Sequence, residues 1–249
     1  MERSINEQLN HYQSIWLEEI FEPYVSQNTH EGISYPFFTG ASERYACAEK
    51  RIMIVGQETN GWSVYKPDWA IADSQKWTID FLDYQLRYSN DPNLKLRFGR
   101  RNSSPFWSFF KAFSARGMVP CWNNIDKAQR CIQGKTMSLT LDSEMELNRN
   151  LPNTDKTLFQ NEVEIMQPDI LVFITGPQYH ATMERAMNLE KGALHELNLS
   201  YETGCIEITS VSGFGIPTFW TYHPRHIMSS KNSLCREDII KMITNGLEL

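Results

Sequence analysis

The chain has 249 residues, of which 41% are hydrophobic and 12% aromatic, so it can bury a sizeable core and is not a disordered protein. A net charge of −6 argues against a protein that coats nucleic acid indiscriminately, although it leaves room for a local basic footprint. No apolar stretch approaches the roughly 20 residues of a membrane span. The N-terminus lacks the basic and then apolar layout of a signal peptide, so we expect a cytoplasmic protein that does not contact a membrane.

The five cysteines are scattered along the chain, without any Cys-x-x-Cys pair. This spacing indicates neither a disulfide framework nor a cysteine cage for zinc or an iron–sulfur cluster. We therefore expect no metal and no cofactor, and reduced thiols that are mostly buried.

The first expected element is a helix over residues 4–22. Ser4 and Glu7 have the spacing of a capping box, in which each side chain satisfies a backbone N–H at the start of a helix. Apolar residues then recur at helical spacing, and Pro23 is expected to help end the helix. The stretch 28–45 is rich in Gly, Ser, Thr and Pro and predicts an irregular connection.

Four short apolar runs that stop abruptly at polar residues predict buried strands, at residues 51–57, 118–125, 169–175 and 217–222. Helical patterns accompany them, at about 74–87, 104–115, 155–167, 178–188 and 233–245. This alternation predicts a single domain over residues 1–249, a three-layer α/β/α sandwich around a four-stranded, mainly parallel sheet. The stretch 201–211 leaves room for one more strand or a hairpin.

Chemically useful side chains follow two of these runs. Glu58 comes directly after the first run, and His223 comes after the last. Open parallel sheets bind ligands at the carboxyl ends of their strands. We therefore expect a carboxylate and an imidazole at one rim of the sheet.

The segments at these two strand ends resemble the uracil-DNA glycosylase superfamily. Its first motif, G-Q-D-P-Y-H in the best-known branch, falls on residues 56–61, and its second, H-P-S-P-L-S, falls on residues 223–228. Further segments match in the expected order. Residues 97–113 resemble a G-x-P-F-like segment followed by a helix, residues 123–127 resemble T-N-x-x-K, and residues 164–176 resemble E-I-x-x-x-x-P-x-x-I-V-x-L-G. The resemblance spans about residues 50–230, with an insertion near 66–94.

The chain departs from the family's pattern inside both motifs. Glu58 stands where the family has Asp, Asn or another residue, Thr59 replaces Pro, and Asn60 falls where a Tyr excludes thymine in the best-known branch. Arg225 and His226 replace Ser and Pro. The iron–sulfur branch, whose T-N-x-x-K segment matches best, needs four spaced cysteines that this chain lacks. The resemblance therefore predicts the fold more directly than it predicts uracil specificity.

The resemblance implies a monomeric DNA glycosylase that hydrolyses the N-glycosidic bond of uracil, or of a related damaged base, without a metal. Glu58 would orient water and stabilise positive charge on the sugar, and His223 would donate a hydrogen bond to the departing base. Asn124 would pair with the base edge, and Phe98 would stack on its face. Further substrate contacts are expected from Gly56, Gln57 and Asn60, and DNA contacts from Arg100, Arg101, Ser103, Ser104, Arg225, Ile227, Met228 and Ser229.

The catalytic and base-binding roles have structural alternatives. Glu58 has the position of an acid in the first turn of a helix, and a histidine before Pro at a strand end is often purely structural. Asn123 beside Asn124 leaves the register of that segment open. Trp62 competes with Phe98 for the stacking role.

The DNA-binding residues have alternatives too. Ile227 and Met228 are expected either to wedge into the duplex or to pack beneath the last helix. The basic cluster at residues 95–101 is consistent with a DNA footprint or with a solvated loop.

Two other functions fit the same residues: a nucleic-acid binder without catalysis, and a hydrolase of nucleosides or nucleotides. The acidic composition and the altered first motif favour these alternatives, whereas Asn124, His223 and the basic cluster favour the glycosylase. The glycosylase reading makes a geometric prediction. Glu58, Phe98, Asn124 and His223 should line one cleft.

Overall fold

The sheet at the centre of the molecule has five strands rather than the four expected. The computed structural model describes residues 3–28, 32–58, 64–68, 70–132, 135–195, 204–229 and 236–245, without the side chains of residues 228 and 229. Strand order is β3-β2-β6-β8-β7. The first four are parallel and are the four predicted runs: β2 (Arg51–Gly56), β3 (Val119–Asn124), β6 (Ile170–Phe173) and β8 (Thr218–Thr221).

The fifth strand, β7 (Cys205–Glu207), pairs antiparallel with β8 at the edge of the sheet. It lies in the stretch that the sequence left open. Three residues are too few to show a clear alternation, so the sequence pattern could not separate this strand from a turn.

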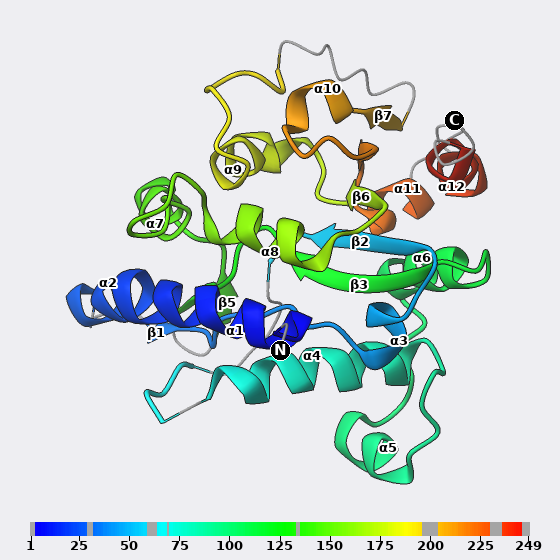
Figure 1. The fold of residues 1–249 in the computed structure, drawn as a ribbon, viewed down its shortest axis with the longest axis horizontal. Helices are drawn as coiled ribbons and strands as arrows, with labels where there is room; N and C mark the ends of the chain where they lie inside the picture. The colour runs from blue at the N-terminus through cyan, green and yellow to red at the C-terminus, as the bar shows by residue number, and fades with distance from the viewer. Residues whose placement is uncertain are drawn as a thin grey trace.

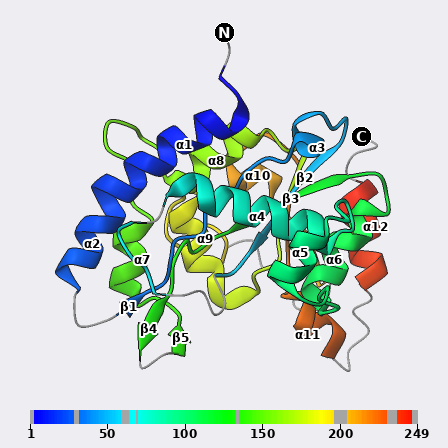
Figure 2. The same cartoon turned by 90° about the horizontal axis from the view of Figure 1, so that it is seen from below.

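Helices cover both faces of the sheet, which explains why the parallel strands are buried along almost their whole length. All of β6 and β8 is buried, as is β2 after its first residue. Helices α1 (Ile5–Trp16) and α8 (Leu158–Met166) lie on one side, and α6 (Pro105–Ser114), α11 (Pro224–Ser229) and α12 (Arg236–Asn245) lie on the other (Figure 2). The predicted α/β class with a mainly parallel sheet is thus confirmed.

The N-terminal helix begins as predicted but continues past its expected end. Ser4 and Glu7 form the capping box. After α1 the chain passes through a π-helical turn, Leu17–Phe21, into α2 (Glu22–Gln27). Pro23 is tolerated because it falls in the first turn of α2, where a backbone N–H is least needed.

A second, smaller sheet was not predicted. It consists of β1 (Gly32–Ile33), β4 (Arg130–Ile132) and β5 (Lys135–Met137), all antiparallel. The remaining short elements are α3 (Glu43–Ala46), α7 (Leu141–Leu147), the 3₁₀ turn Pro177–Tyr179, α9 (His180–Ala186) and α10 (Thr209–Ser212). Most are too short to carry a readable hydrophobic period.

A long helix lies along the β3 edge of the main sheet, within the stretch expected to be an insertion. Helix α4 (Ile71–Gln85) contacts α1 and β3, and α5 (Pro92–Phe98) packs against α4 (Figure 1). Among the described residues, no helix is long and apolar enough to cross a membrane.

A buried ion pair lies just beyond the carboxyl end of β3. Lys127 Nζ is 2.5 Å from Glu162 Oε2 of α8, and both side chains are almost completely buried. The Lys127 ammonium also donates to Asn123 Oδ1 at 2.5 Å, and Asn123 Nδ2 donates to Glu162 Oε2 at 3.0 Å. Gln13 Nε2 donates to the other oxygen of Glu162 at 2.9 Å. The two charges are therefore paired and hydrogen-bonded on several sides, as burial requires.

Replacing Glu162 by Gln should lower the free energy of unfolding by about 3–5 kcal/mol, because Lys127 then loses its counter-charge inside the protein. Urea unfolding measures the change. Glu164→Gln on the same helix is the control, because Glu164 pairs with Lys156 at the surface, where an ion pair contributes about 0–1 kcal/mol. Equally small losses in the two variants would show that the buried pair does not hold the fold.

Candidate active site

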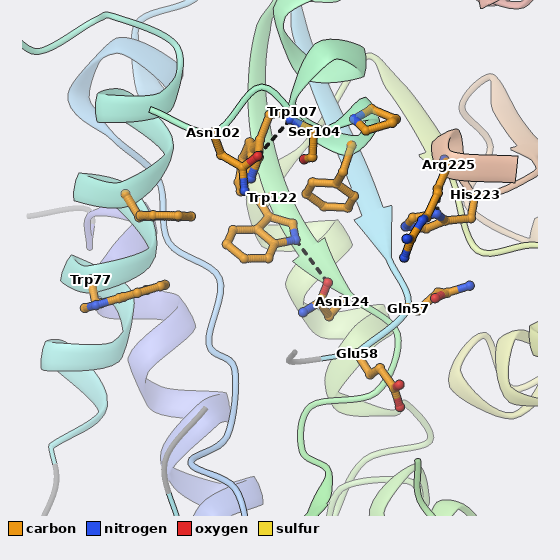
Figure 3. Close-up of a pocket in the computed structure, with 13 residues that line it drawn as sticks. Gln57, Glu58, Trp77, Asn102, Ser104, Trp107, Trp122, Asn124, His223 and Arg225 are labelled. Atoms are coloured by element: carbon orange, nitrogen blue, oxygen red, sulfur yellow. Dashed lines mark hydrogen bonds between the residues drawn. The ribbon is translucent and has the colours of Figure 1, made fainter. Parts of the chain in front are cut away.

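A cleft of about 680 Å³ lies at the carboxyl ends of β2, β3 and β8. Gln57 and Glu58 follow β2, Asn124 ends β3, and His223 follows β8, so three of the four residues expected to share a cleft do share it (Figure 3). The other lining residues are Trp77, Phe81, Asn102, Ser104, Pro105, Phe106, Trp107, Trp122 and Arg225. The cleft therefore combines convergent polar groups with a large aromatic surface.

The orientation of the Asn124 amide is fixed by its neighbour Trp122. The indole Nε1 of Trp122 donates to Asn124 Oδ1 at 3.0 Å (Figure 3). Because an indole N–H can only donate, the amide oxygen must face it, and Nδ2 occupies the other branch. Asn124 is 1% exposed, and among the described residues no acceptor bonds its Nδ2. An unpaired buried donor costs about 1–3 kcal/mol, which a ligand with a well-placed acceptor would recover.

Gly56 is required beside this amide. A Cβ atom at position 56 would lie 2.6 Å from Asn124 Oδ1 and 3.2 Å from Cε2 of Phe106. A Cβ atom cannot lie at the first distance, so the Asn124 amide can keep this position only beside a glycine. Gly56 therefore leaves room for the side-chain oxygen of Asn124.

The open register at Asn123 and Asn124 is now settled. Successive side chains of a strand point to opposite faces. Asn123 bonds Lys127 and Glu162 in the buried network, and Asn124 consequently lines the cleft.

His223 lines the cleft as a hydrogen-bond donor. The backbone N–H of Arg225 donates to His223 Nδ1 at 3.3 Å, so the neutral ring carries its proton on Nε2. Burial lowers the pKa of His223 from its ordinary value, and the Arg225 charge lowers it further. Both causes favour the neutral ring at pH 7, and the hydrogen bond from Arg225 N–H selects its Nε2–H tautomer. The ring of Phe106 lies alongside the imidazole, with centroids 6.2 Å apart.

Glu58 borders the cleft, but its carboxylate points away from Asn124 and His223 (Figure 3). Ser138 donates to Glu58 Oε1 at 3.2 Å. Burial raises the pKa of Asp126 well above its usual range, and the Glu144 and Glu58 charges raise it further. Burial also raises the pKa of Tyr179, with Glu58 and Asp126 contributing. The Glu58 carboxylate thus points toward other ionisable groups, Asp126 and Tyr179. It must rotate to face the centre of the cleft.

Phe98 does not line the cleft, contrary to expectation. It ends α5, where its ring meets Trp77 edge-on at 5.5 Å and Phe81 at 5.0 Å. Phe106 stands beside Gly56 and His223 instead. The signal for Phe106 is its position directly after Pro105, which matches the end of a G-x-P-F-like segment better than Phe98 does.

Of the predicted DNA-binding residues, Ser104 and Arg225 line the cleft. Arg100 and Ser103 are exposed on the segment that leads into α6. Arg101 donates to the carbonyl oxygens of Tyr84 and Ser89 at 2.8 and 3.2 Å, so its guanidinium holds this segment to the end of α4.

The expected wedge is not formed by Ile227, which is 3% exposed and packs in the main core. The alternative of packing beneath the last helix explains it better. Residues 60 and 62 and the side chains of residues 228 and 229 lie outside the described part of the chain. Gln57 lines the cleft, and its Nε2 donates to the Thr175 carbonyl at 2.5 Å, which joins the ends of β2 and β6.

Sequence reasoning missed four aromatic residues that line the cleft from α4, α6 and β3, namely Trp77, Phe81, Trp107 and Trp122. Their spacing is that of ordinary core residues, so only the fold reveals that they border a cleft. Within the described residues, no group of three or more His, Cys, Asp or Glu side chains is placed to hold a metal ion. No model of a known protein family matches this chain, and no curated protein matches it either.

The tautomer and pKa of His223 can be checked directly. In nitrogen-15 NMR spectra the ring should show a protonated Nε2, and its titration midpoint should lie below about 6.5. Arg225→Gln should move the midpoint toward the ordinary value, because it removes a nearby positive charge while the backbone N–H remains. His223→Gln identifies the signal. A midpoint above 6.5, or a proton on Nδ1, would contradict this assignment.

Proposed function

We propose that this protein is a DNA glycosylase that releases a base carrying a ring carbonyl, with uracil as the prime candidate. One observation carries the proposal. On neighbouring strand ends, the cleft presents a buried amide donor without a partner among the described residues, Asn124 Nδ2, and an imidazole held in its neutral donor form, His223. The resemblance of the two strand-end segments to uracil-DNA glycosylases points to the same chemistry.

The reaction needs opposite charges stabilised at two places. As the bond between C1′ and the base nitrogen breaks, its electron pair leaves with the base, the sugar becomes positive, and a water oxygen then bonds to C1′. The Nε2–H of His223 would stabilise the negative charge on the base oxygen, because a preorganised donor in a partly buried site acts strongly on developing charge. Glu58, after rotation toward the cleft, would stabilise the sugar and accept a proton from the water.

Asn124 would select the base. Its Nδ2 needs an acceptor, which uracil and hypoxanthine offer as a ring carbonyl. Cytosine and adenine present an amino group at the corresponding position, so donor would face donor there. A site built around a buried donor rejects such a base, because both groups lose their hydrogen bonds.

A second function is favoured by one observation, the orientation of Glu58. Its carboxylate is bonded to Ser138 and directed away from the cleft. A protein that keeps this arrangement with a ligand bound would hold the base without releasing it, and so would act as a nucleic-acid binder.

Base release under single-turnover conditions tests the proposal. Oligonucleotides with uracil in a single strand, in a U·G mismatch or in a U·A pair, and a hypoxanthine substrate, should lose the base to the wild-type protein. His223→Ala and Glu58→Gln should each slow release by about 10² to 10³, the usual effect of removing one preorganised electrostatic group. Binding without release would select the binder. Faster release from free deoxyuridine than from DNA would select a nucleoside hydrolase.

Trp122→Phe should weaken the choice between uracil and cytosine. The variant keeps an aromatic ring but removes the N–H that orients Asn124, so the amide can present its oxygen to an amino group. The preference for free uracil over cytosine, measured by calorimetry, should fall by a factor of roughly 5 to 150, which corresponds to about 1–3 kcal/mol. Trp107→Phe is the matched control, because Trp107 lines the same cleft without being the donor to Asn124. An unchanged preference in Trp122→Phe would remove this residue from base selection.

A further inference from the structure

The cleft extends well beyond the residues that would hold one base. Its volume of about 680 Å³ lies in the range of ~300–1,000 Å³ that suits drug-sized ligands, which are much larger than a pyrimidine. Asn124, His223 and Phe106 form one end. The other end is formed by α4, through Trp77 and Phe81, and therefore by the insertion.

Aromatic rings connect the two ends without a break. Starting beside His223, the ring of Phe106 meets Trp122 at 5.8 Å between centroids. Trp122 meets Phe81 at 6.3 Å, and Phe81 stacks on Trp77 at 4.9 Å with an interplanar angle of 17°. Trp77, Phe81 and Phe106 are half-buried although they are large and apolar. A series of rings bordering an open cleft is the usual construction of a surface on which successive nucleobases stack.

Positive charge lies beside Asn102, one of the residues that line the cleft. Lys111 Nζ donates to the carbonyl oxygen of Asn102, a lining residue, at 3.0 Å. Burial lowers the pKa of Lys111, and the charges of Arg87 and Arg101 lower it further. The carbonyl acceptors of Lys111 and Arg101 are neutral, so these contacts do not cancel the charge. A polyanion entering the cleft would be attracted to this rim.

We propose that the α4 end of the cleft is a second binding subsite, which takes the nucleobase next to the one held at Asn124 and His223 and stacks it on Trp77. The phosphates of the strand would then lie toward Lys111 and Arg101. This inference rests on the proposed function only in that the ligand is a nucleic-acid strand. It implies a single-stranded or locally opened substrate, because a paired neighbour remains stacked in its duplex.

Binding of short ligands tests the subsite. The probes are deoxyuridine monophosphate and the dinucleotide of two deoxyuridines, both with a 2′-fluoro sugar, which resists base loss because fluorine disfavours positive charge on C1′. The dinucleotide should bind the wild-type protein more tightly than the mononucleotide. Trp77→Ala should weaken dinucleotide binding by roughly 5- to 150-fold, the effect of losing one stacked base, and leave mononucleotide binding unchanged. Trp77→Phe should retain most of the gain.

Phe98→Ala is the matched control, because Phe98 contacts Trp77 and Phe81 but does not line the cleft. If Phe98→Ala weakened dinucleotide binding as much as Trp77→Ala, or if Trp77→Ala weakened both ligands equally, Trp77 would be structural and the subsite would be overturned. Equal affinity of the wild-type protein for the two ligands would also overturn it, while base release from DNA would leave the glycosylase proposal standing. Tighter binding of the dinucleotide than of the mononucleotide, without any base release from DNA, would support the subsite and refute the glycosylase proposal.

Discussion

The buried pair of Lys127 and Glu162 determines which way the side chains at the end of β3 point. A buried ion pair adds little net stability, because desolvation offsets much of the attraction between the charges. Its contribution here is geometric. The ammonium and the carboxylate both bond Asn123, so this residue has to face the network, and alternation along the strand then turns Asn124 to the opposite face. Asn124, the residue that would bind the base edge, is therefore positioned by two charged side chains that do not line the cleft.

Two further constraints act on the same amide from the cleft side. Trp122 supplies a donor that can only pair with Oδ1. Gly56 leaves no atom where a Cβ would collide with that oxygen. Together with the network behind β3, these contacts leave one orientation for Asn124, with Nδ2 as the group available to a ligand. Such preorganisation costs nothing at the moment of binding, which is the condition for a polar group to discriminate strongly.

The sequence was sufficient for the parallel strands and for three positions at their ends, because both depend on local patterns. Short apolar runs that stop at polar residues identify strands, and the topology of a parallel sheet then brings Glu58, Asn124 and His223 to one edge. The failures depend on distant contacts. The direction of the Glu58 carboxylate is set by Ser138, from a segment that no pattern links to β2. Phe98 and Ile227 carry no local mark that separates packing from binding, and only the fold shows that both pack.

The aromatic end of the cleft and the polar end share one anchor. Gln75 of α4 donates to Gln13 Oε1 at 2.7 Å, and Gln13 in turn bonds Glu162. Gln75 thereby ties helix α4 to the network that positions Asn123. It lies two residues before Trp77, whose ring borders the cleft. Buried hydrogen bonds with strict geometry thus help to position α4, together with its packing on α1 and β3. Helix α4 therefore borders the cleft while its own polar contact holds it to the core.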